Sequence, residues 1–427
     1  KELFEGLKIM DMEDDWKQYP VIRLDMSRGG ASAEGIRSYL NLCFKSYEQK
    51  YAITPDPTAQ LADRFDAIIT TAYRQTGMQV VVLIDEYDSP LQHSWKTPEH
   101  EECTNVYRNV FAILKADDEY ERFVFITGIT KFTQISLFSA LNNLTNISFL
   151  PQYAPLCGIT DEEISENFMP ELEKMAEMNN WTLQQTHDKL KEYYDGYHFS
   201  RKNMIDIYNP FSILNALSKK ILADYWFRTG SPTYLVRLLS HFDENINEMV
   251  NRYYPTSSFI DYKADVEAPL PMIYQSGYLT IKDWEMDTNS YLLDFPNDEV
   301  KHGFLTMLAT SYLKPSESTD AWVVQVVKVM KEGDCKELEN LLTSFFASIP
   351  YTQRRKDDER EKERYFQYTF YLVLRMISCF TVFIEKQQSE GRVDCVVETQ
   401  NYIYIFEFKR DGSAEEALKQ IEEMGYA

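Results

Sequence analysis

The sequence lacks the features that mark a membrane, secreted or strongly basic protein. No apolar run approaches the ~18–20 residues that cross a bilayer and no signal peptide opens the chain, so we expect neither a membrane span nor export. The 6 cysteines lie far apart without a C-x-x-C pair, which argues against a zinc site or a disulfide framework and suits a reducing cytoplasm. Positive charge is scarce too, with 44 Lys and Arg against 67 Asp and Glu and a net charge of −23. This balance disfavours broad, non-specific attraction to nucleic acid.

The composition is otherwise that of an ordinary globular protein, and one segment stands out. Hydrophobic residues make up 44% of the chain. Its length of 427 residues predicts two or three domains. In residues 80–88, VVVLIDEYD, an unbroken apolar run leads into Asp85 and Glu86. Such a run predicts a strand buried on both faces of a parallel sheet, whose carboxyl end is where ligands bind. In a nucleotide hydrolase Asp85 would hold Mg²⁺ and Glu86 would orient the attacking water, which is the Walker B pattern. The alternative is a plain strand end where a carboxylate meets solvent.

Two further observations bear on this interpretation. Residues 123–128, FVFITG, predict a second apolar strand that brings Thr127 (or Thr130) beside Asp85, where a hydroxyl would sense a γ-phosphate or simply satisfy the strand end. The phosphate-cradling loop G-x-x-x-x-G-K-[ST] occurs nowhere in the chain. Because the chain also begins at Lys1 rather than Met, we expect a fragment of a longer protein. We do not expect this fragment alone to hydrolyse ATP.

Changes in the predicted secondary structure along the chain indicate three parts. Residues 1–158 alternate strands and helices around the acidic strand, as in a parallel α/β sheet. Residues 159–348 are mostly helical, with capping boxes at Thr160 and Thr182 and a helical stretch over 320–346. A β-hairpin predicted over residues 277–295, with a helix before it and a helix after it, is compatible with a winged-helix-like arrangement. The aromatic turn YDGYHF of residues 194–199 is more typical of core anchors than of a ligand site. Residues 354–364 are all charged, which predicts a boundary before the last part, residues 349–427.

The last part contains a constellation of charges on two predicted strands, residues 392–397 and 402–408. Alternation along the second strand puts Glu407 and Lys409 on the same face, and Asp394 lies near the start of the partner strand. Two carboxylates would bind Mg²⁺ or Mn²⁺ through oxygen, and Lys409 would position or deprotonate a water for attack on a phosphodiester. The alternative is a cross-strand ion pair at a sheet edge.

Several blocks of the sequence resemble one known architecture. In chain order they are LFEGLKI from Leu3, LIDEYDSPL from Leu83, FITGITKF from Phe125, SLFSALNNL from Ser136, YDGYHF from Tyr194, IYNPFSILNA from Ile207, YQSGYLTI from Tyr274, and GRVD from Gly391 with YIYIFEFK from Tyr402. This order resembles a bacterial family of predicted AAA-ATPase-like proteins that carry a PD-(D/E)XK nuclease domain at the C-terminus. The resemblance covers essentially the whole chain.

The resemblance implies roles for single residues. It assigns the Walker B carboxylates and the nuclease triad to residues already singled out: Asp85, Glu86, Asp394, Glu407 and Lys409. Gln420 falls where the family has a supporting Gln on the following helix. Glu363 falls where a helix Glu often helps the metal site, with Glu385 as a rival. The family often reads E-x-Y-Y-H-S at this helix, whereas the chain has ERYFQY from Glu363, so no role is expected for that His.

The expected fold class is α/β, with α/β domains at both ends of the chain and a mostly helical part between them. Residues 1–158 would be a P-loop NTPase-like domain without its Walker A region, residues 159–348 a helical and winged-helix-like middle, and residues 349–427 a nuclease-like domain that is C-terminally incomplete. The implied function is a cytoplasmic protein in which ATP, bound with Mg²⁺, gates DNA binding or cleavage by a Mg²⁺- or Mn²⁺-dependent nuclease. The prediction includes no membrane contact and is compatible with an oligomer.

Two alternatives belong to other functional classes. The first is a signalling or scaffold ATPase whose nuclease fold serves as a binding platform, which suits the acidic composition. The second is a regulator that reads duplex DNA through the winged-helix-like hairpin. That reading expects several cations on the helix of residues 234–242, where Arg237 is the only Lys or Arg.

Overall fold

The computed structural model describes residues 1–95, 97–129, 143–200, 205–229, 249–258, 270–304, 319–348, 381–388, 391–399, 401–406 and 413–423. The chain divides into two compact units. The first contains Lys1–Ser148 and Pro255–Gly277, and the second contains Phe149–Tyr254 and Tyr278–Ala427. None of the described helices is both long enough and apolar enough to span a bilayer.

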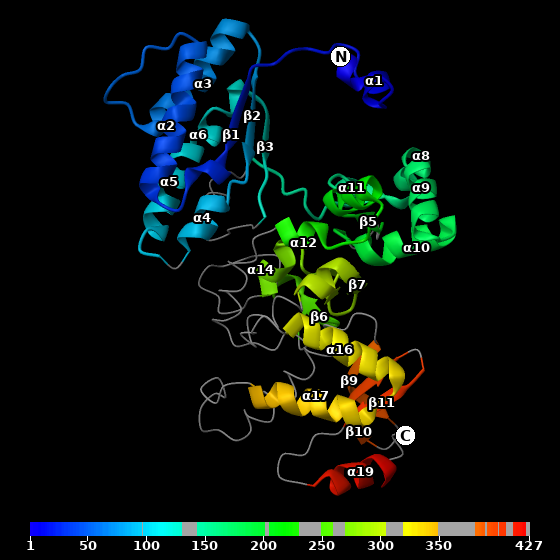
Figure 1. Cartoon of the computed structure of the whole chain (residues 1–427). Coiled ribbons are helices and arrows are strands. Elements are labelled where there is room, and N and C mark those ends of the chain that lie inside the picture. The colour runs from blue at the N-terminus through cyan, green and yellow to red at the C-terminus, as the bar shows by residue number, and fades with distance from the viewer. Residues whose placement is uncertain are drawn as a thin grey trace. The chain divides into compact units, whose positions relative to one another are not determined.

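The first unit is built on a parallel sheet with helices beside it (Figure 1). Its strands, in the spatial order β1-β2-β3, are β1 (Val21–Asp25), β2 (Val80–Asp85) and β3 (Glu121–Ile126). Its α-helices are α1 (Ile9–Met12), α2 (Ala33–Lys50), α3 (Leu61–Thr76), α4 (Ser89–Ser94), α5 (His100–Phe111), α6 (Ile113–Ala116) and α14 (Leu270–Gln275). Short 3-10 turns are η1 (Glu2–Phe4), η2 (Met26–Gly29), η3 (Asp118–Tyr120) and η6 (Thr256–Ser258). The parallel sheet expected from the sequence is confirmed.

The central strand β2 is buried on one side only, within the described residues. Val80, Val82 and Ile84 are buried, whereas the alternate positions of the strand are half-buried. The prediction of a strand buried on both faces is therefore wrong for this part of the chain. In Figure 1 the helices α2, α3 and α5 lie on one side of the three strands, which explains the asymmetry. Because β1 pairs with β2 in the register Asp25↔Asp85, the carboxyl ends of the two strands lie at one edge.

Local signals explain how the chain enters β2. Helix α3 begins with a reciprocal capping box between Gln60 and Asp63, which satisfies two amides that have no partner inside the helix. It ends at Gly77, whose φ of 67° is a left-handed conformation that glycine adopts without steric cost. Phe65 of this helix stacks on Phe44 of α2 with a ring-centroid distance of 5.3 Å. The helix pair thereby forms a packed layer beside the sheet.

The second unit contains a helical part followed by two three-stranded sheets. The helical part has η4 (Pro151–Tyr153), β4 (Ile159–Thr160), α8 (Asp161–Asn167), α9 (Met169–Asn179), α10 (Leu183–Tyr194), β5 (Ile207–Tyr208), α11 (Pro210–Lys219) and α12 (Tyr225–Thr229). The first sheet has the order β6-β8-β7, with β6 (Arg252–Pro255), β7 (Thr280–Glu285) and β8 (Ser290–Asp294). The last segment has α16 (Thr319–Glu332), α17 (Cys335–Ser348), β9 (Thr381–Gln388), β10 (Gly391–Glu398), β11 (Ile403–Phe406) and α19 (Ala414–Glu423).

The expected helix starts in this unit are confirmed. Thr160 and Thr182 each accept a hydrogen bond from the amide three residues on, and Glu163 and Gln185 return the contact. The helices then bury one shared core made of Ile164, Leu172, Met175, Leu190, Tyr194, Tyr208, Ile213, Ala216 and Leu217. The capping chemistry sets where each helix begins, and the apolar positions decide which face turns inward.

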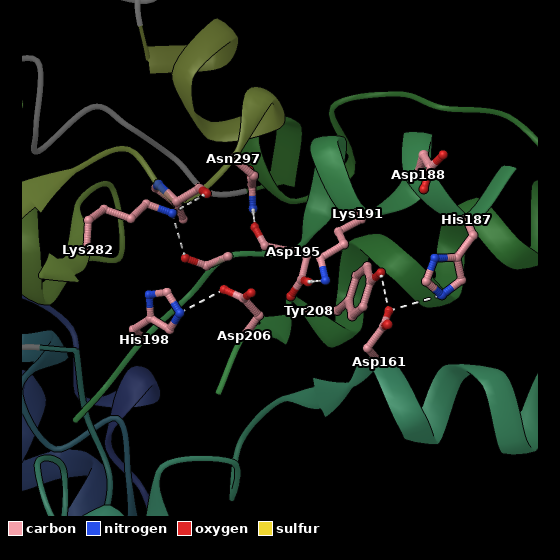
Figure 2. A network of polar contacts seen from close by, with 12 residues as sticks. Asp161, His187, Asp188, Lys191, Asp195, His198, Asp206, Tyr208, Lys282 and Asn297 are labelled. Atoms are coloured by element: carbon pink, nitrogen blue, oxygen red, sulfur yellow. Dashed lines mark hydrogen bonds and ion pairs between the residues drawn. The ribbon is translucent and has the colours of Figure 1, made fainter. Parts of the chain in front are cut away.

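The turn that follows α10 is held from several sides (Figure 2). Asn297 Nδ2 donates to the carbonyl of Asp195 at 3.0 Å. Lys282 Nζ donates to the carbonyls of Gly196 and Pro296, both at 2.9 Å. Gly196 has φ +94°, and an added Cβ would lie 2.4 Å from the oxygen of Pro296, so only glycine fits there. A lysine from β7 thus ties the turn to the end of β8.

A histidine continues this network. His198 Nε2 lies 2.7 Å from Asp206 Oδ1, and its Nδ1 donates to the carbonyl of Ile281 at 2.8 Å. His198 also exchanges backbone hydrogen bonds with the hydroxyl of Thr280. Together with the buried rings of the turn, these contacts make residues 194–198 a structural junction between the helical part and the β6-β8-β7 sheet. The expected anchoring role of the aromatic turn agrees with this burial.

The hairpin predicted over residues 277–295 is confirmed by the antiparallel pairing of β7 with β8. The helix expected within residues 230–248 for the winged-helix-like arrangement lies outside the described residues. The winged helix therefore stays a prediction.

The helical hairpin α16–α17 packs on the sheet β11-β10-β9. Their shared core consists of Val326, Val329, Met330, Leu338, Cys395 and Val397. The helical character expected over residues 320–346 is confirmed, and the structure divides this stretch into two helices at Gly333 and Asp334. Gly333 adopts φ +77° after α16, and Asp334 then caps α17 by accepting from the amide of Glu337 at 3.0 Å. A left-handed glycine followed by an N-cap ends one helix and starts another.

Candidate functional site

The carboxyl edge of the parallel sheet brings together residues from separate parts of the chain. Thr127 Oγ1, just past β3, donates a hydrogen bond to Asp85 Oδ1 at 2.6 Å. Arg23 Nη2 lies 3.7 Å from the other carboxylate oxygen of Asp85. About half of the Asp85 side chain remains exposed, at 50%. The expected neighbourhood of Thr127 and Asp85 is confirmed, whereas Thr130 lies outside the described residues.

Glu86 has the most unusual backbone at this edge. Its φ is +47°, a left-handed conformation that costs a non-glycine residue about 1–3 kcal/mol. The pKa of its carboxyl is raised, first by partial burial and then by the negative charges of Asp25, Asp85 and Asp88, with His93 acting in the opposite direction. A carboxylate whose pKa is raised is a better proton acceptor for a nearby water than an ordinary one. Strain and a raised pKa in one residue are typical of functional positions.

The sequence analysis singled out Asp85 and Glu86 but missed Asp88. Asp88 is 1% exposed, and its side chain binds the amide of Ile129 and the amide group of Gln92. Asp88 is the third carboxylate of the DEYD run, but the charges in a sequence do not show which of these side chains is buried. Only the fold distinguishes the buried carboxylate from the exposed ones.

The donor set at this edge suits Mg²⁺ bound together with a nucleotide. Mg²⁺ prefers oxygen ligands, keeps several waters, and is usually held by one or two carboxylates plus substrate phosphates. Asp85 offers such an oxygen at an exposed strand end. Within the described part of the chain, no three His, Cys, Asp or Glu residues converge into a preformed metal cluster. Asp85 would therefore be one ligand among waters and phosphates.

The second candidate site lies on the sheet β11-β10-β9. Asp394 is in β10, and the pairing Cys395↔Phe406 brings the end of β11 next to it. Glu407 and Lys409 fall in residues 407–412, and Glu363 falls in residues 349–380, all outside the described residues. Gln420 lies in α19, which begins at the capping box expected between Ser413 and Glu416.

The pairing of β9 with β10 shows which residue lies across from Asp394. Cys395 and Val397 face the helical hairpin α16–α17, so position 394 belongs to the opposite face by alternation. The pairs Val393↔Lys386 and Cys395↔Ile384 put position 385 across from position 394. Glu385, which the sequence left as a rival of Glu363, thus occupies the register position directly opposite Asp394. Like charges directly opposite each other are destabilising unless a cation or proton lies between them.

Comparison with known proteins finds one family match over the parallel sheet and another over the C-terminal sheet. Residues 1–138 match the family model described as a predicted AAA-ATPase, and residues 361–427 match the PD-(D/E)XK nuclease superfamily. The protein therefore combines an ATPase-like region with a nuclease-like region. The chain is also 32% identical over 434 residues to a protein of Azotobacter chroococcum mcd 1 named "Uncharacterized protein in vnfD 5'region", an alignment covering 100% of this chain and 81% of that relative. The chain belongs to the same family, that of predicted AAA-ATPase-like proteins with a C-terminal PD-(D/E)XK nuclease domain.

Proposed function

We propose that this protein is a nucleotide-controlled nuclease, in which the ATP state of the N-terminal region gates DNA binding or cleavage by the C-terminal region. The observation that supports the ATPase half most strongly is Glu86. A left-handed glutamate with a raised pKa, next to Asp85 at the carboxyl edge of a parallel sheet, is costly for a plain strand end. The same features are useful in a residue that orients and deprotonates a water.

In this proposal each residue at the sheet edge has its own task. Asp85 would hold Mg²⁺, and Glu86 would accept a proton from the attacking water. Thr127, already bonded to Asp85 at 2.6 Å, senses the γ-phosphate through that hydroxyl. Mg²⁺ bound with ATP would neutralise the negative charge that develops on the phosphates. A phosphate-cradling loop is also needed, and no such motif occurs in these 427 residues.

In the nuclease-like region, Asp394 and Glu407 would hold Mg²⁺ or Mn²⁺ through oxygen. Lys409 would hold the attacking water near the phosphodiester, and Gln420 would support the arrangement from α19. The register of β9 and β10 favours Glu385 as the additional carboxylate, because it stands across from Asp394. Glu363 is the competing assignment.

The test is cleavage of single- and double-stranded DNA by the full-length natural protein, with Mg²⁺ or Mn²⁺ and with or without ATP. The key variants are Lys409→Ala and Glu86→Gln, and Lys336→Ala, an exposed lysine of α17, is the matched control. We expect cleavage that Lys409→Ala abolishes, that ATP alters, and that loses its ATP response in Glu86→Gln. Full cleavage in Lys409→Ala would refute the assignment of the nuclease site.

A second function has one observation in its favour. The net charge of −23 is unfavourable for a protein that must approach DNA, and it suits a signalling or scaffold ATPase whose nuclease fold binds another protein. Absence of cleavage by the full-length protein under every condition, combined with measurable ATP hydrolysis, would favour this alternative. In that case Asp394, Glu407 and Lys409 would form a structural ion cluster.

A further inference from the structure

The loops that follow β2 and β3 are bonded to each other along their length. The amide of Thr127 donates to the carbonyl of Ile84 at 2.8 Å, and the amide of Tyr87 donates to the carbonyl of Thr127 at 3.0 Å. The hydroxyl of Thr127 then reaches Asp85. At residue 129 a side chain holds the two loops together as well.

That side chain is Asp88. Its Oδ1 accepts a hydrogen bond from the amide of Ile129 at 3.2 Å, and its Oδ2 accepts one from Gln92 Nε2 at 2.6 Å. Its carbonyl accepts from the amides of Leu91 and Gln92 at the start of α4. One buried residue therefore joins the Walker B loop, the loop after β3 and helix α4. A buried carboxylate is stable only where it has such partners.

The contact surface between the two loops leaves no room for a larger residue at position 128. A Cβ on Gly128 would lie 2.4 Å from Asp88 Oδ1 and 2.6 Å from the ring of Tyr87. Real Cβ contacts are essentially never that short, so the chain approaches Asp88 this closely only because residue 128 is glycine. The close approach of Gly128 to Asp88 and the hydrogen bond from Ile129 to Asp88 thus both hold the loop after β3.

We propose that Asp88 is a positioning residue for ATP hydrolysis: by binding the amide of Ile129, it holds the loop after β3 against the end of β2 and keeps the hydroxyl of Thr127 on Asp85. Asp88 does not touch the nucleotide. It acts through Thr127, whose place beside Asp85 depends on where residues 127–129 lie. The inference rests on the function proposed above, because it assigns a task within that same site.

The experiment measures ATP hydrolysis by the full-length natural protein as kcat and KM separately. Asp88→Ala removes the acceptor of the Ile129 amide, and Asp88→Asn keeps an oxygen in the same place. We expect Asp88→Ala to lower kcat by roughly tenfold to a hundredfold, the effect of a displacement near 1 Å, with KM for ATP changed less than about threefold. Asp88→Asn should restore most of the rate, which a loss of overall stability would not predict. The matched control is Asp117→Ala, a buried aspartate at the other end of β3, which should leave kcat unchanged.

Each outcome decides the proposal. A kcat of Asp88→Ala equal to that of the Asp117 control would overturn it, as would an Asp88→Asn variant that is as slow as Asp88→Ala. A large rise in KM with unchanged kcat would assign Asp88 to nucleotide binding and also overturn it. Should Asp88→Ala fail to fold, Gly128→Ala disturbs the same contact from the other loop and must show the same loss of kcat. If the unmutated protein does not hydrolyse ATP, the proposed function itself fails, whereas intact hydrolysis in Asp88→Ala refutes only this inference.

Discussion

The buried carboxyl of Asp195 makes the stability of the second unit depend on pH. The residue is 2% exposed at the turn after α10 (Figure 2). Burial raises the pKa of its carboxyl to about 6, the charges of Asp206 and Asp161 add to this, and the amide of Gly196 and the ammonium of Lys191 oppose it. The ordinary value is 3.8, so the folded protein binds a proton at this site more tightly than the unfolded chain does.

The direction and size of the effect follow from linkage. Because the pKa of the folded state is higher than that of the unfolded state, the stabilisation is fully present below about pH 4. It is lost as the pH rises through about 6. A difference of two pKa units corresponds to roughly 3 kcal/mol in the free energy of unfolding. Asp195→Asn keeps a neutral side chain of the same shape at every pH, and it removes this loss.

The assay is chemical unfolding of the unmutated protein and of Asp195→Asn at pH 4.5 and pH 7.5. We expect the variant to gain roughly 2 kcal/mol relative to the unmutated protein between the two pH values. The control is Asp188→Asn, an exposed aspartate on the preceding helix α10, for which the difference should stay constant. A constant difference for Asp195→Asn as well would show that the buried carboxyl does not carry a raised pKa, and the reasoning would be refuted.

Three further predictions follow from single contacts. Gly196→Ala should cost roughly 2–4 kcal/mol in urea unfolding, because the residue has φ +94° and its Cβ would lie 2.4 Å from a backbone carbonyl oxygen; unfolding equal to the unmutated protein would contradict this. Thr127→Val should slow ATP hydrolysis in the full-length protein by roughly tenfold through loss of the 2.6 Å bond to Asp85, and Thr127→Ser should keep the rate. Met330→Ala in α16 should cost roughly 2–4 kcal/mol and speed amide hydrogen exchange in β10, because the residue is fully buried in the core that α16, α17 and β10 share. Unchanged exchange in β10 would show that the helical hairpin does not support the sheet.

The sheet edge illustrates how far sequence reasoning reaches. The apolar run before Asp85 predicted the strand and its carboxyl end, and the second apolar run predicted that Thr127 would lie beside it. The burial of the strand was overestimated, because a sequence shows which positions are apolar but not how completely each face is covered. The sequence pattern did not predict the burial of Asp88 or the left-handed backbone of Glu86.

The helical hairpin beside the C-terminal sheet is a second case. The sequence predicted helix over residues 320–346 without marking a break, because apolar periodicity continues across Gly333 and the residues on both sides favour helix. The register that sets Glu385 across from Asp394 was equally hidden, since strand pairing depends on a partner elsewhere in the chain. The helix break has a local cause in Gly333 and Asp334, whereas the strand register depends on contacts with a partner strand.

The sequence by itself determined the elements whose causes are local. Capping boxes at Thr160 and Thr182 act over three residues, and the alternation of apolar and polar positions acts within one strand or helix. Tertiary structure alone decided which side chains meet. Thr127 and Asp85 are 42 residues apart, and Asn297 and Asp195 are 102 apart. The physical reason is that a hydrogen bond or a buried charge is stabilised by partners that the folded chain brings together, and no local propensity encodes those partners.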